Sequence, residues 1–118
     1  MLYTNLEHIE TAGEFTRIIE ENENVVVICG RMGPLCVPVY RVVEELVNEF
    51  SEVKFYDMEY DNPEFYFFHA RPEVQNLEEI PFTILYRNGE VVKSVGGLQT
   101  KIQLKRILTE EFSTKINA

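Results

Sequence analysis

The chain has 118 residues, of which 45% are hydrophobic and 26% are charged. This length suits one domain with a single hydrophobic core, and this composition is typical of a folded domain rather than a disordered segment. The 11 basic and 20 acidic residues give a net charge of −9, which repels phosphate backbones and argues against general nucleic-acid binding.

The sequence also bears on the cellular location of the protein and on the redox state of its cysteines. No apolar run approaches the roughly 20 residues that a membrane-spanning helix needs. Residues 1–5 have neither the basic nor the apolar region of a secretory signal, and two cysteines are too few for a disulfide-stapled secreted domain. We therefore expect one cytoplasmic domain over residues 1–118, without a membrane partner, that ends in a polar tail at 113–118.

The first half of the chain predicts a helix, a strand and a second helix. Residues 11–14 have the spacing of a capping box, and apolar residues at helical spacing follow them as far as about residue 21. The β-branched run at 25–29 predicts a strand buried on both faces. After a loop, apolar positions over residues 39–50 recur with helical spacing and predict the longer helix.

The second half predicts a strand, a short helix, a hairpin and a last helix. Residues 52–60 alternate as a core strand does, and a turn with a short helix over 65–70 follows, then an irregular stretch at 72–79. The Asn88-Gly89 pair is a strong signal for a two-residue hairpin between strands 82–86 and 91–95. Apolar positions between 104 and 112 mark the final amphipathic helix.

This order of elements predicts an α/β fold. A strand–helix–strand crossover makes the first two strands parallel, and the hairpin adds an antiparallel edge. We expect a central mixed sheet with helices on both faces.

Four features follow one another along the chain. A β-branched run leads into a Gly-Pro/Cys turn before a long helix, and residues 61–63 (Asp-Asn-Pro) follow the second core strand. Ile80-Pro81 stands directly before the hairpin, and the Asn88-Gly89 turn leads to Gly96-Gly97 and the final helix. In this order the four features resemble the thioredoxin family over nearly the whole chain. The resemblance implies a thioredoxin-like fold, a cis peptide bond at Pro81 and a thiol-disulfide site near Cys36.

The site departs from the thioredoxin pattern, because the chain has no Trp and no Cys-x-x-Cys. Two alignments with the Cys-Gly-Pro-Cys motif are open. In the first, residues 36–39 overlay the motif, Cys36 matches the nucleophile and Val39 replaces the resolving cysteine. In the second, residues 33–36 overlay it and Cys36 matches the buried resolving cysteine. Pro38 favours the first alignment, because proline is tolerated only in the first helical turn.

Cys36 is the predicted catalytic residue. Free N–H groups at a helix N-terminus stabilise a thiolate, and Arg31 and Arg41 are close enough in sequence to add to this. We hypothesise that the thiolate attacks a disulfide or an activated sulfur and forms a mixed disulfide. Without a resolving cysteine, turnover needs an external thiol or a cysteine of the partner.

The resemblance also implies the substrate-binding residues. Ile80 and Pro81 form the edge that pairs with an extended substrate segment, and Pro34, Val37 and Pro38 flank the thiol. The alternative for Pro81 is a simple strand-start proline.

Cys29 has two interpretations: a small buried side chain, or a second thiol that pairs with Cys36. Residues 65–69 (Phe-Tyr-Phe-Phe-His) either cover the core or form an interaction patch. No ligand set at metal spacing accompanies His69, so we expect no metal or other cofactor.

Two functions therefore remain open. The first is thiol-disulfide exchange, or another redox role, through a single cysteine with a protein thiol or disulfide as partner. The second is a redox-inactive binding module, similar to phosducin-like adaptors, in which Cys36 is structural. Fold alone does not separate the two.

Overall fold

A computed structural model describes residues 2–75 and 79–112 of the chain. Its five strands form one sheet in the order β1-β3-β2-β4-β5. The elements, in chain order, are β1 (Glu7–Ile9), α1 (Ala12–Glu21), β2 (Asn24–Gly30), α2 (Val37–Val47), β3 (Lys54–Glu59), the 3₁₀ turn η1 (Pro63–Phe65), α3 (Tyr66–His69), α4 (Pro72–Gln75), β4 (Phe82–Arg87), β5 (Glu90–Gly96) and α5 (Lys101–Phe112).

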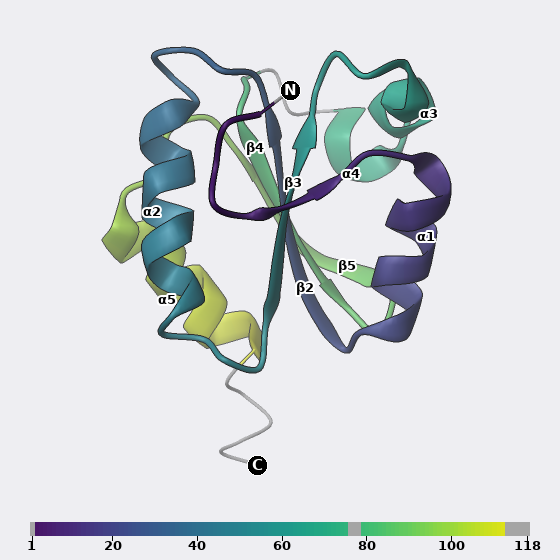
Figure 1. The fold of residues 1–118 in the computed structure, drawn as a ribbon. Coiled ribbons are helices and arrows are strands. Elements are labelled where there is room, and N and C mark those ends of the chain that lie inside the picture. The colour runs from purple at the N-terminus through teal and green to yellow at the C-terminus, as the bar shows by residue number, and fades with distance from the viewer. Residues whose placement is uncertain (1, 76–78, 113–118) are drawn as a thin grey trace.

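The sheet is mixed, as predicted. β3 pairs in parallel with both β1 and β2, whereas β4 is antiparallel to β2 and β5 is antiparallel to β4. Figure 1 views the sheet along its edge, with α2 and α5 on one face and α1, α3 and α4 on the other. The predicted α/β class is therefore confirmed.

Local signals in the sequence account for several of these elements. Thr11 caps α1, since its side chain accepts from the Glu14 backbone N–H at 3.1 Å while the Glu14 carboxylate accepts from the Thr11 N–H at 3.1 Å. All seven residues of β2 are buried, as a central strand requires. Asn88 and Gly89 have φ values of 53° and 84°, the left-handed conformation that a tight hairpin turn needs.

Two apolar cores lie on opposite faces of the sheet. On the α2 face, Val26 and Ile28 of β2 pack with Cys36, Tyr40 and Leu104. The alternate residues of β2 point to the α1 face and pack with the aromatic side chains there; they are Val25, Val27 and Cys29. The two cysteines consequently belong to different cores.

Some elements differ from the prediction. Strand β1 was missed, because it has three residues and forms through pairing with β3. The stretch at 72–79 was predicted to be irregular but begins with α4, whose first residue is a proline, as helix starts favour. The polar tail at 113–118 lies outside the described residues. In residues 2–75 and 79–112, no helix has the length and apolar character needed to cross a lipid bilayer.

Candidate functional site around Cys36 and Pro81

A tight turn carries the chain from β2 into α2. The backbone N–H groups of Cys36 and Val37 both donate to the Gly33 carbonyl, at 3.1 and 3.0 Å. Cys36 is the N-cap residue of α2, and Pro38 lies in the first helical turn. Proline is tolerated there, so the start of α2 is where the proline argument predicts it.

The thiol of Cys36 is nevertheless closed off from solvent. The residue is 3% exposed and belongs to the core on the α2 face. Its Sγ accepts a weak hydrogen bond, 3.5 Å long, from the Arg31 backbone N–H. The helix start agrees with the first alignment, whereas this burial is what the second alignment implies for a resolving cysteine.

Gly30, the last residue of β2, is where the parts of the site meet. A Cβ atom at this position would lie 2.6 Å from Tyr40 Oη, 3.1 Å from Cys36 Sγ and 3.1 Å from Pro81 Cβ. The thiol, the tyrosine and the proline ring thus converge on the space that glycine leaves open. No larger residue fits without displacing one of them.

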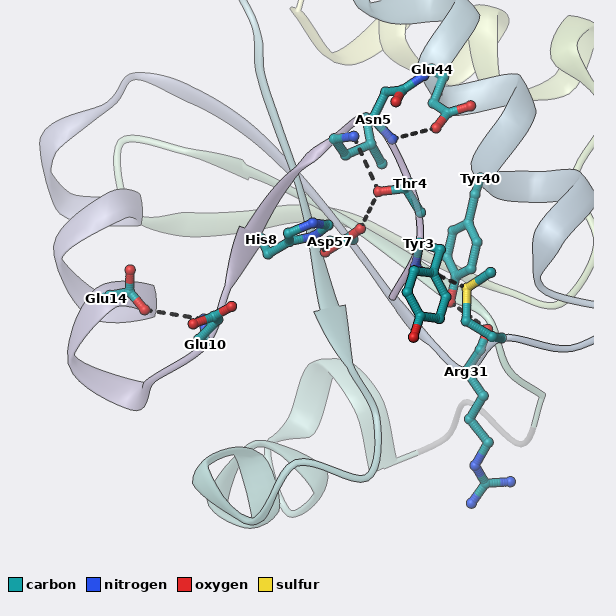
Figure 2. Close-up of polar contacts among 12 residues, drawn as sticks. Tyr3, Thr4, Asn5, His8, Glu10, Glu14, Arg31, Tyr40, Glu44 and Asp57 are labelled. Carbon is teal, nitrogen blue, oxygen red and sulfur yellow. Dashed lines mark hydrogen bonds and ion pairs between the residues drawn. The ribbon is translucent and has the colours of Figure 1, made fainter. Parts of the chain in front are cut away.

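Tyr40 ties this cluster to the loop after β2. Its hydroxyl donates to the Arg31 carbonyl at 2.8 Å, and Figure 2 shows the ring reaching from α2 toward that residue. Burial raises the pKa of Tyr40 well above its ordinary value. The phenol is therefore a neutral hydrogen-bond donor next to Cys36.

The two arginines proposed to support a thiolate are engaged with carboxylates. Arg31 holds Asp61 through two hydrogen bonds of 2.6 and 2.9 Å, and this pairing lowers the pKa of the Asp61 carboxyl. Arg41 contacts Glu44 at 3.0 Å. The contact that the Cys36 sulfur does make with Arg31 is to the backbone N–H and not to the guanidinium.

An open groove lies beside the closed thiol. It has a volume of about 440 Å³ and is lined by Leu35, Glu79, Ile80, Gly97 and Leu98; we call it the Leu98 groove. The Leu35 and Leu98 residues are 59% and 55% exposed. The Gly97 N–H donates to the Pro81 carbonyl at 2.8 Å, so the end of β5 forms one wall of the groove.

The predicted substrate-binding residues differ in burial and in whether they line the Leu98 groove. Ile80 is half-buried and lines the groove, and Pro81 follows it through a cis peptide bond and is buried. Pro34 and Pro38 are exposed, and Val37 packs against the core of the α2 face. None of these last three lines the Leu98 groove.

Cys29 lies on the other side of the sheet from Cys36. It is fully buried in the core of the α1 face, and this burial raises the pKa of its thiol far above the ordinary value. Both cysteines are free. A Cys29–Cys36 disulfide stays a prediction, and the placement of the two thiols in separate cores does not support it.

A buried polar cluster near the site escaped sequence reasoning. Asp57 on β3 is 1% exposed; its carboxylate accepts from Thr4 Oγ1 at 2.5 Å and lies 2.6 Å from His8 Nδ1, and Figure 2 shows the three side chains pointing toward one another. Burial raises the pKa of Asp57, although both hydrogen bonds oppose the rise. This cluster fastens the N-terminal segment across β3.

Known proteins resemble this chain in structure but not detectably in sequence. No protein-family model matches the chain, and no curated protein matches it in sequence. Among solved structures, Plasmodium falciparum thioredoxin is 24% identical with a TM-score of 0.74, over 90% of this chain and 99% of that one.

Two further thioredoxins agree. Mitochondrial thioredoxin 3 from Saccharomyces cerevisiae is 19% identical with a TM-score of 0.74, over 89% of this chain and 94% of that one. Thioredoxin O2 from Arabidopsis thaliana is 15% identical with a TM-score of 0.76, over 94% and 97%. Because these TM-scores extend over about nine-tenths of this chain or more, the chain has the thioredoxin fold.

Proposed function

We propose that this protein is a thioredoxin-fold binding module that holds an extended segment of a protein partner in the Leu98 groove. The observation that carries the proposal is an open apolar groove next to a thiol that is closed off. Leu35 and Leu98 present apolar surface to solvent, whereas the one thiol on this face is 3% exposed. Binding of a partner needs exposed apolar surface, which the groove provides. Nucleophilic attack needs an accessible sulfur, which Cys36 does not provide.

The backbone beside the groove supports recognition of an extended segment. Among the described residues, the peptide groups of Ile80 make no hydrogen bond. An incoming strand is able to use such free groups, while pockets for its side chains add specificity. In this proposal the protein works in the reducing cytoplasm, where both of its thiols stay free.

Selection from a displayed library of random peptides tests the proposal. Peptides selected on the wild type should lose binding to Leu98→Asp, because a charge at Leu98 disrupts the apolar wall. They should keep binding to Cys36→Ser, because Cys36 is buried and does not line the groove. Ile102→Asp is the matched control, since Ile102 is 74% exposed on α5 and does not line the groove. Selected peptides that bind Leu98→Asp as well as wild type would contradict the proposal.

Single-thiol exchange is the second candidate, favoured by one observation: Cys36 Sγ lies at the start of α2 and beside Pro81, across Gly30. In this reaction the Cys36 thiolate attacks one sulfur of a partner disulfide, the S–S bond breaks, and the other sulfur leaves as a thiolate that takes up a proton. A second thiol, from the partner or a small thiol such as glutathione, then displaces Cys36.

The exchange requires the 33–36 turn to open so that the Cys36 sulfur becomes accessible. Trapping of Cys36 as a mixed disulfide measures whether this opening occurs. Incubation with glutathione disulfide, followed by intact-mass analysis, should give a Cys36-dependent adduct if this function operates. Cys29→Ser controls for the other thiol. Absence of an adduct in native protein, with modification after unfolding, would exclude this candidate.

A further inference from the structure

Glu79 places a negative charge in the wall of the otherwise apolar Leu98 groove. The residue is exposed and lines the groove with Leu35, Ile80 and Leu98. Among residues 2–75 and 79–112, the carboxylate has no hydrogen-bond or ion-pair partner. The Asp61 carboxylate, by contrast, is paired with Arg31.

Gly97 is what leaves room for this carboxylate. Its φ of +76° belongs to the left-handed region that favours glycine. A Cβ atom at Gly97 would collide with Glu79 Oε2, and would lie 3.3 Å from Cδ of the same side chain. The Glu79 carboxyl group therefore sits directly over the end of β5, inside the groove.

We propose that Glu79 makes the Leu98 groove selective for segments that carry Lys or Arg next to an apolar side chain. This inference rests on the proposed function. A basic side chain has an apolar stem that suits Leu35 and Leu98, and a cationic head that the carboxylate is placed to receive. The net charge of −9 adds attraction for a basic segment.

The same peptide selection provides the test, with peptides resynthesised in pairs. Peptides that depend on Leu98 should be enriched in Lys or Arg. For one such peptide, Glu79→Gln should weaken binding about two- to fivefold, as expected for an exposed charge pair. The partner peptide with Gln in place of the basic residue should bind wild type and Glu79→Gln equally.

Glu90→Gln is the matched control, because Glu90 is exposed and begins β5, at the far end of the strand from Gly97. It should leave both peptides unaffected. The selectivity alone would be overturned if Leu98-dependent binding were the same with and without the basic residue. It would also be overturned if Glu79→Gln left that binding unchanged. Absence of any Leu98-dependent binding would instead overturn the proposed function on which it rests.

Discussion

Gly30→Ala should destabilise the protein strongly, because the added methyl group enters the point where the site converges. The new Cβ would lie 2.6 Å from Tyr40 Oη and 3.1 Å from both Cys36 Sγ and Pro81 Cβ. Overpacking of a core by one methyl group costs about 1–3 kcal/mol. Displacing Tyr40 also breaks its hydrogen bond to the Arg31 carbonyl, worth about 1 kcal/mol, so the free energy of unfolding should fall by about 2–4 kcal/mol.

Urea unfolding followed by far-ultraviolet circular dichroism measures this loss, and the chain's lack of Trp makes this signal preferable to fluorescence. With a slope of about 2 kcal/mol per molar urea, the midpoint should drop by about 1–2 M. Gly13→Ala is the matched control. Nothing lies within 4 Å of its new Cβ, and alanine in a helix is favoured over glycine by up to about 1 kcal/mol.

Tyr40→Phe completes the comparison, since it removes the oxygen closest to the new methyl group. The cost of Gly30→Ala should be smaller in the Tyr40→Phe background, with a coupling energy of about 0.5–3 kcal/mol. A Gly30→Ala protein with the wild-type midpoint would refute the geometry of the site. So would strictly additive effects of the two substitutions, because the side chains would then not be in contact.

Two further predictions concern buried groups. Burial raises the pKa of Asp57 in the folded state. The favourable contribution of this group to the free energy of unfolding is therefore complete below the ordinary carboxyl pKa of about 3.9, and it is lost as pH rises through the folded-state pKa. Asp57→Asn should therefore gain stability relative to wild type with increasing pH; a constant difference in unfolding free energy across a urea series at pH 3 to 8 would contradict this. Cys29→Ser should lower the free energy of unfolding by about 1–3 kcal/mol, since it buries a hydroxyl in an apolar core, whereas Cys29→Ala should cost less. Equal melting temperatures of the Ser variant and wild type would argue against that burial.

The features that the sequence predicted are those encoded within a few residues. The Thr11 capping box, the buried β2 run and the Asn88-Gly89 turn each depend on neighbours in the chain, and each is present. Pro38 located the start of α2 in the same way. Local stereochemistry decides such elements before tertiary packing does.

The features that sequence reasoning missed depend on distant segments. The Leu98 groove joins a turn before α2, the residues before β4 and the loop after β5, and no spacing in the sequence shows that they meet. The Asp57–His8 contact spans 49 positions. The burial of Cys36 likewise depends on how the 33–36 turn packs over Gly30 and Tyr40, which a lone cysteine before a helix pattern does not reveal.

The alkylation rate of Cys36 in the native protein shows whether its sulfur is closed off from solvent. Iodoacetamide labelling, with peptide mapping to separate Cys36 from Cys29, gives the rate in native buffer and in denaturant. A sealed sulfur that is exposed only by a local opening of about 3 kcal/mol should react about 100-fold more slowly in the native state. A native rate equal to or above the unfolded rate would show that the thiol is accessible and would contradict the account of a closed thiol beside a binding groove.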